Sequence, residues 1–306
     1  MTEHGAYAPD LVPEFVIDGH VHIWDLERAR YPWLTPEIGE LHRSVKFDEI
    51  APTLSRLGID AAILVQASDE ADDTEVMLAA AEGSPSIVGV VAWSPLDTPD
   101  EMERTLARFD AIPSVVGIRN LIHERPREWV WRPQVEESLG ILAAHRLPLD
   151  VPTADHRALP DVAWMGEKAP QLTLVIDHLG KPPINGTAEE KREWRAMLAD
   201  CAQNPLTVAK VSGLYAMTGP MDGWTADGVR PFVDDALELF GADRLLYGGD
   251  WPISTLAGGY ERTWTAISEM LSGLSDVDKR AVLSGTAMRV YLSRPSRTYE
   301  HNEVSQ

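Results

Sequence analysis

The sequence has one cysteine, Cys201, among its 306 residues, so no disulfide can form within the chain. It also lacks the basic start followed by an apolar segment that marks a secretory signal. Its apolar runs, such as residues 87–93, are too short to cross a bilayer. We therefore expect a cytoplasmic protein without a membrane partner, in a compartment that keeps thiols reduced.

Positive charge is scarce in the sequence. Lys and Arg number 27 against 48 Asp and Glu, which gives a formal net charge of −21. A field of this sign repels phosphates and argues against nucleic acid as a partner. A local basic pocket for an acidic small molecule stays open, and so does assembly into a homo-oligomer.

No glycine-rich phosphate or dinucleotide loop follows the first apolar run, which weakens the case for an open doubly wound sheet. Eight short apolar segments instead alternate with helical patterns. The expected strands cover residues 15–18, 61–65, 87–93, 115–118, 147–151, 172–176, 206–211 and 244–247. The expected helices cover residues 47–57, 75–81, 98–109, 133–145, 159–168, 188–203, 229–240, 260–271 and 276–292.

The expected strands are continuously apolar, which is typical of strands buried on both faces. Eight strand-helix units in a chain of this length predict an α/β fold, a (β/α)8 TIM barrel. No repeat or low-complexity linker divides the sequence. We therefore expect a single domain over residues 1–306, with its core at about residues 15–292 and loosely held tails.

Polar residues follow most of the expected strands at the point where each ends. In a barrel of this kind the carboxyl ends of the strands meet at one face, which carries the active site. The residues are His20, His22, Gln66, Ser68, Trp93, Ser94, Arg119, His178, Lys210, Ser212 and Asp250. Lys210 is either a group of the site or a salt-bridged residue inside the barrel.

His20 and His22 are separated by one residue. In an extended strand such residues face the same side, so the two imidazoles would project together. Together they could hold a metal ion or polarise a carbonyl. A bare His-x-His is short, and the same pattern also occurs where polar side chains merely alternate at a strand end.

Several motifs resemble those of the amidohydrolase superfamily, and specifically its sugar-lactonase branch. The more specific ones are Asp-His-Leu-Gly-Lys-Pro at residues 177–182 and Gly-Gly-Asp-Trp-Pro at residues 248–252. Ile-Asp-Gly-His-Val-His-Ile-Trp-Asp at residues 17–25, Pro-Trp-Leu at 32–34, Gly-Ile-Arg at 117–119 and Ser-Gly-Leu at 212–214 also match. The resemblance extends over nearly the whole chain.

The resemblance implies a catalytic set formed by four side chains, which are His20, His22, His178 and Asp250. It also implies that Arg119 contacts the substrate. We expect further substrate contacts from strand ends and neighbouring loops, namely Gln66, Trp93, Trp33, His123 and Trp251. The sequence departs from the family pattern at Val21, Gly249 and Thr286; the first two could alter substrate fit, and Thr286 concerns helix packing.

Hydrolysis of a lactone, a cyclic ester, needs a base for water, an electrophile on the carbonyl oxygen and a proton for the leaving alkoxide. Asp250 is the expected base and later the acid. His20, His22, His178 and Asp250 could also hold one divalent ion, with Zn favoured because it prefers imidazole. Metal-free catalysis stays open.

Superfamily members with two metal ions have a bridging lysine or carboxylate and two further histidines. The resemblance therefore does not imply such a centre here, because the fourth expected strand ends in Arg119 rather than lysine and residues 149–151 offer no histidine. The leading hypothesis is a hydrolase that opens a sugar-acid lactone. The alternatives are a dicarboxylate (2-pyrone-type) lactonase, a metal-dependent decarboxylase on the same barrel, and a catalytically silent binding protein. A dicarboxylate would require several cationic groups around the substrate, and the strand ends offer few.

Overall fold

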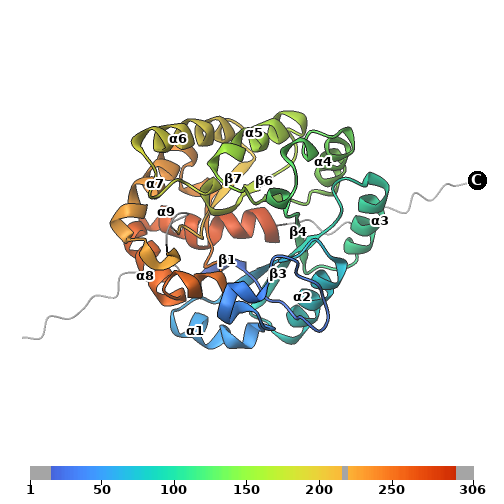
Figure 1. Ribbon diagram of the computed structural model, residues 1–306, viewed down its shortest axis with the longest axis horizontal. Coiled ribbons are helices and arrows are strands. Elements are labelled where there is room, and N and C mark those ends of the chain that lie inside the picture. Colours follow the sequence, from blue (N-terminus) through green and yellow to red (C-terminus); the bar gives the residue numbers. More distant parts are fainter. Residues whose placement is uncertain (1–14, 216–219, 294–306) are drawn as a thin grey trace, which may run out of the picture.

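The computed structural model describes residues 15–215 and 220–293, and its eight parallel strands follow one another around a barrel in sequence order. The strands are β1 (Ile17–Val21), β2 (Ala61–Val65), β3 (Ile87–Trp93), β4 (Val115–Arg119), β5 (Leu149–Val151), β6 (Leu174–Ile176), β7 (Thr207–Val211) and β8 (Leu245–Tyr247). Helices surround the strands (Figure 1). The predicted (β/α)8 barrel is confirmed, whereas both predicted tails fall almost entirely outside the described residues.

The helices lie between the strands as the alternating pattern predicted. They are α1 (Ala51–Arg56), α2 (Ala71–Gly83), α3 (Pro99–Phe109), α4 (Pro133–His145), α5 (Leu159–Lys168), α6 (Ala188–Ala202), α7 (Ala226–Phe240), α8 (Tyr260–Leu271) and α9 (Asp276–Arg280). Within the described ranges, no helix is both long and apolar enough to span a membrane.

Several helices differ from their predicted bounds; α1, for example, begins at Ala51 rather than at residue 47, and α7 begins at Ala226 rather than at residue 229. α2 begins at Ala71 rather than at residue 75, and Asp72 and Asp73 in its first turn suit the positive end of the helix dipole. The last predicted helix, residues 276–292, is α9 continued by two π-helical segments, Ala281–Gly285 and Met288–Leu292. The apolar spacing predicted one long helix but could not show this wider winding.

The interior of the barrel is a separate apolar cluster. It collects buried residues from seven of the strands, including Ile17, Val65 and Leu246, together with Ala287 and Tyr291 near the end of the described chain. The opposite faces of the strands pack against the helices in a larger cluster. Burial on both faces explains why the strands read as continuous apolar runs.

The barrel closes between β8 and β1 through residues that follow β8. The Asp250 N–H donates to the His20 carbonyl over 2.8 Å, and the His22 N–H donates to the Trp251 carbonyl over 2.7 Å. The closing hydrogen bonds therefore join the backbones of three residues of the predicted catalytic set.

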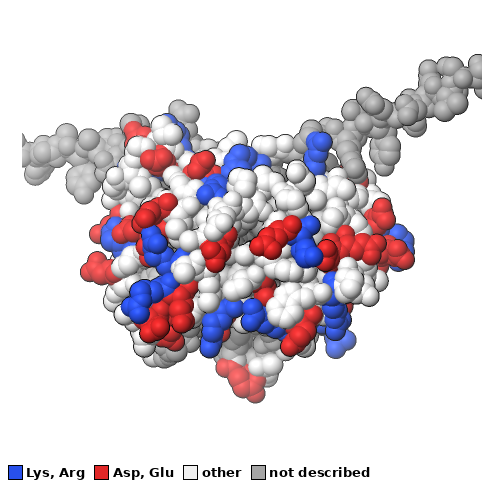
Figure 2. Space-filling view, turned by 90° about the horizontal axis from the view of Figure 1, so that it is seen from above, with Lys and Arg blue, Asp and Glu red and all other residues white. Residues whose placement is uncertain are grey.

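Charged side chains of both signs are mixed over the face drawn in Figure 2. Ion pairs among the described residues include Arg195 with Asp235 and Arg127 with Asp161. On this face the acidic side chains therefore lie among basic ones.

Candidate active site

A cavity of about 400 Å³ opens at the carboxyl ends of the strands. Several predicted residues line it, namely His22, Trp33, Arg119, His123, His178 and Asp250. Leu121, Glu124, Lys181, Gly213, Tyr215 and Ile253 are among its other lining residues. The size suits a small-molecule substrate.

β1 delivers its histidines through a local irregularity. The pairing of β1 with β2 shifts register between Asp18 and Val21. The Asp18 carboxylate accepts hydrogen bonds from the Gly249 N–H at 2.8 Å and the Tyr260 hydroxyl at 2.6 Å. A Cβ on Gly19 would lie 2.5 Å from Leu246 Cδ1, so glycine lets β1 approach β8 closely here.

The two histidines meet, but they lie at different depths. Their Nε2 atoms are 3.0 Å apart, and Asp250 Oδ1 lies 3.7 Å from Nε2 of His20 and 3.6 Å from that of His22. His22 lines the cavity, whereas His20 is fully buried and is not among the cavity-lining residues described. The two imidazoles therefore project to the same side, as predicted, but His20 lies beneath His22.

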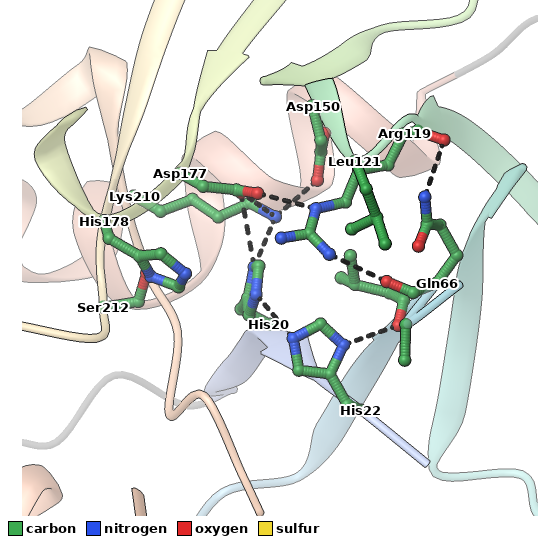
Figure 3. A network of polar contacts seen from close by, with 12 residues as sticks. His20, His22, Gln66, Arg119, Leu121, Asp150, Asp177, His178, Lys210 and Ser212 are labelled. Carbon is green, nitrogen blue, oxygen red and sulfur yellow. Dashed lines mark hydrogen bonds and ion pairs between the residues drawn. The ribbon is translucent and has the colours of Figure 1, made fainter. Parts of the chain in front are cut away.

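The His22 ring is neutral and its proton can be placed. Burial and the Arg119 charge lower the pKa of His22 to about 3. Its Nδ1 lies 2.7 Å from the Val65 carbonyl oxygen, which can only accept (Figure 3). Nδ1 therefore carries the proton, and Nε2 presents a lone pair.

Asp250 and His178 are held beside each other in unusual backbone conformations. Both have positive φ, 53° for Asp250 and 55° for His178. His178 Nδ1 lies 2.8 Å from the Ser212 hydroxyl. A Cβ on Gly213 would lie 2.4 Å from His178 Nδ1 and 2.9 Å from Asp250 Oδ2, so glycine is needed there.

Burial also makes Asp250 an unusually basic carboxylate. Desolvation raises the pKa of Asp250 to about 8, against the lowering effect of the Arg119 charge. For His178, burial lowers the pKa to about 3 and keeps the imidazole neutral. The site thus pairs a strong carboxylate base with neutral imidazoles.

Arg119 is held by groups on both sides. Its Nε donates to Asp177 Oδ2 at 2.9 Å, and its Nη1 donates to the Gln66 carbonyl at 2.8 Å. The Gln66 side-chain amide donates in turn to the Arg119 carbonyl at 3.0 Å. These bonds leave further guanidinium N–H groups for a ligand in the cavity.

Lys210 lies inside the barrel beneath this layer, fully buried. Its Nζ contacts Asp150 Oδ2 at 2.5 Å, His20 Nδ1 at 2.9 Å and Asp177 Oδ1 at 3.1 Å. The sequence left open whether Lys210 was a site group or a salt-bridged barrel residue. It is salt-bridged and also touches a predicted catalytic histidine.

Three of the predicted substrate contacts are not lining residues of the cavity. Among the described residues, Gln66, Trp93 and Trp251 do not line it. Gln66 is fully buried and supports Arg119, and the Trp251 carbonyl closes the barrel. Their contact with a substrate stays a prediction, as do the catalytic roles of the four residues that the structure gathers.

Sequence reasoning missed Lys181 and Tyr215 as lining residues. Lys181 belongs to the Asp-His-Leu-Gly-Lys-Pro motif, and that position was the available signal. The suggestion that Val21 and Gly249 alter substrate fit receives no support, because neither lines this cavity among the residues described. Val21 packs in the outer apolar cluster, and Gly249 packs against Tyr260. The Thr286 hydroxyl donates to the Asp243 carbonyl over 3.0 Å.

The donor atoms suit a divalent cation. One atom each from His20, His178 and Asp250 lies within 4.8 Å of the others, and the bare Nε2 of His22 lies next to them. Imidazole nitrogens with one carboxylate are a common set for Zn. The described residues therefore fit a single ion at the base of the cavity.

A barrel of this type, with histidines and an aspartate around a cavity at the carboxyl ends of its strands, is typical of a (β/α)8-barrel enzyme. The family described as amidohydrolase matches residues 17–292, and the chain belongs to this family. It is 31% identical over 288 residues to L-fucono-1,5-lactonase of Burkholderia ambifaria, covering 92% of this chain and 97% of that protein.

Solved structures agree with this assignment. A crystal structure of an amidohydrolase from Burkholderia multivorans with bound HEPES has a TM-score of 0.84 and 31% identity, covering 91% of this chain and 99% of that one. A crystal structure of an amidohydrolase from the same organism with bound Zn has a TM-score of 0.82 and 30% identity, with the same coverage.

Proposed function

We propose that this enzyme hydrolyses a sugar-acid lactone. The observation that carries the proposal is Asp250, a buried carboxylate of raised pKa that lines the cavity 3.6 Å from the Nε2 of His22. The similarity to L-fucono-1,5-lactonase supports an aldonolactone as substrate. We also propose that the enzyme is cytoplasmic, as expected from the sequence.

Asp250 is the general base in the proposed reaction. Its carboxylate takes a proton from water as the water oxygen attacks the ester carbonyl. The ring C–O bond then breaks, and the protonated Asp250 returns the proton to the departing alkoxide. The pKa of about 8 brings the carboxylate closer to the operating pH, which favours both transfers.

The negative charge that develops on the carbonyl oxygen needs donors at the cavity wall. Arg119 has guanidinium N–H groups left after its bonds to Asp177 and Gln66. Lys181 lines the same cavity, and no hydrogen bond or ion pair holds its ammonium among the residues described. We assign these two cations to the oxyanion and the substrate oxygens, with neutral His178 orienting the carbonyl or water.

If a divalent ion is bound, His20, His22, His178 and Asp250 would hold it, with Zn the best match to these donors. Such an ion would supply a more acidic water and a Lewis acid for the carbonyl. The positions of Arg119 and Lys181 serve the substrate in either case.

The cavity suits a sugar lactone better than a dicarboxylate. Its cationic lining residues are Arg119, already paired with Asp177, and Lys181. Asp250 and Glu124 line the same space with carboxyl groups. A second carboxylate on the substrate would meet these acids rather than a cluster of cations.

A lactone panel tests the proposal. Purified protein is offered 1,4- and 1,5-aldonolactones and 2-pyrone-4,6-dicarboxylate, and acid release is followed with a pH indicator, with and without a chelator. We expect turnover of aldonolactones. Absence of acid release from every aldonolactone would refute the proposal. Loss of activity in the chelator, with recovery on adding Zn, would assign the ion a role.

Asp250→Asn tests the base. We expect kcat to fall by about a hundredfold or more, the usual size of a general-base contribution. Asp234→Asn, an exposed carboxylate on α7, is the matched control and keeps full activity. Unchanged turnover of a folded Asp250→Asn enzyme would remove Asp250 from its role.

A further inference from the structure

A chain of buried polar contacts runs from the end of the described chain to the active site. The Tyr291 hydroxyl donates to Asp150 Oδ1 at 2.7 Å, and Asp150 Oδ2 accepts from Lys210. Lys210 meets His20, and His20 meets His22 (Figure 3). His20 thus lies between an ammonium on one ring nitrogen and an imidazole on the other.

The contact with Lys210 decides where the His20 proton lies. An ammonium only donates hydrogen bonds, so at 2.9 Å it requires a lone pair on His20 Nδ1. The ring is neutral in its buried position, so its single proton lies on Nε2. Nε2–H then donates to the bare His22 Nε2 at 3.0 Å, and His22 donates from Nδ1 to Val65. Every donor in this series of hydrogen bonds therefore has an acceptor.

The same arrangement of protons disfavours His20 as a metal ligand through Nε2. A histidine that binds metal through Nε2 carries its proton on Nδ1, and a carboxylate or carbonyl usually accepts that proton. Here the nearest group to Nδ1 is a donor. Asp177 Oδ1 lies 3.4 Å from Nδ1 and 3.1 Å from the Lys210 ammonium, and this carboxylate oxygen is the acceptor that the other tautomer would use.

We propose that Lys210 is a positioning residue that keeps the ring proton of His20 on Nε2 and thereby weakens metal binding at the active site. Metal binding requires that proton to leave Nε2 and a proton to be placed on Nδ1, directed at Asp177 Oδ1. Lys210 then loses one of its three acceptors. The lysine thus favours the hydrogen-bonded histidine pair over the metal-bound one.

Lys210→Met tests this inference, because methionine fills a similar volume without donating. Two readouts follow it: long-range ¹H–¹⁵N NMR of the imidazoles in metal-free protein, with His20 assigned by its loss in His20→Gln, and zinc affinity by competition with a chromophoric chelator. We expect the proton on Nε2 in the wild type and on Nδ1 in the variant, with zinc bound about tenfold to a hundredfold more tightly.

The single variant leaves Asp150 and Asp177 without their shared cation. Lys210→Met/Asp150→Asn restores the charge balance and carries the test if the single variant does not fold. Lys168→Met, on the half-exposed lysine beside Glu136, is the control with unchanged zinc affinity. A wild-type His20 proton on Nδ1, or zinc affinity that does not rise in the folded Lys210 variants, would overturn the inference. Neither readout uses a substrate, so failure here is separate from failure of the lactone proposal.

Discussion

Asp73 is a buried carboxylate outside the active site. It accepts hydrogen bonds from the Tyr31 hydroxyl at 2.7 Å and the Ala67 N–H at 2.8 Å, yet desolvation raises its pKa to about 6. A raised carboxyl pKa means that the folded state binds the proton more tightly than the unfolded chain. The stabilisation from this protonation is present below about pH 4 and is lost as the pH rises through about 6.

Asp73→Asn is therefore expected to flatten part of the pH dependence of stability. From about pH 5 to about pH 7.5, the free energy of unfolding of the wild type should fall by about 1 kcal/mol more than that of the variant. Denaturant unfolding followed by tryptophan fluorescence measures this. Exposed Asp72, its neighbour on α2, supplies the control Asp72→Asn. Parallel curves for the wild type and Asp73→Asn would contradict the expectation.

At this scale, the sequence predicted residue types better than residue depth. The spacing of His20 and His22 correctly placed both imidazoles on one side of β1. It could not show that His22 lines the cavity while His20 lies beneath it, in contact with Lys210, which is 190 residues away in the sequence. Lys181 was missed because a lysine after a strand end is more often a surface residue.

The turn after β8 shows how one element constrains its neighbours. A Cβ on Gly249 would lie 2.1 Å from Tyr260 Cε2 and 2.5 Å from Asp18 Oδ2. We expect Gly249→Ala to lower the free energy of unfolding by about 1–3 kcal/mol through overpacking. Tyr260→Ala in the same chain should recover part of this loss, because it removes the ring in the way.

A double-mutant cycle on urea unfolding measures this coupling. Gly140→Ala is the control, since a Cβ on this exposed glycine of α4 meets nothing within 4 Å. It should raise stability by up to about 1 kcal/mol, the helix preference of alanine over glycine. Additive effects of Gly249→Ala and Tyr260→Ala would show that the ring is not the obstacle.

Element types could be predicted from the sequence because both periodicities were clear. Each of the eight expected strands overlaps an observed one, and β2 and β3 have the predicted bounds. The bounds of α2 and the winding after α9 could not be predicted, since both depend on packing. The irregular register of β1 against β2 also escaped prediction, because register depends on the neighbouring strand.

At the scale of the whole molecule, the barrel followed from counting strand-helix units, but its closure did not. The hydrogen bonds that join β8 to β1 come from Asp250 and Trp251, which follow the expected strand. The segment after α9 also contributes to the interior of the barrel, which its place near the end of the described chain did not indicate. It runs across the barrel in Figure 1, and Ala287 and Tyr291 join the interior cluster.

Tyr291 therefore connects the stability of the barrel with the polar contacts below the active site. It is 1% exposed, and its hydroxyl bonds to Asp150, which pairs with Lys210. Tyr291→Phe should cost about 1–3 kcal/mol by removing a donor from a buried carboxylate, and Tyr291→Ala about 3–5 kcal/mol because it also leaves a cavity. Urea unfolding measures both, with half-exposed Met288→Ala as the control on the same segment. Equal losses for Phe and Ala would assign the whole effect to the hydroxyl, and a neutral Tyr291→Ala would show that the barrel is closed without this segment.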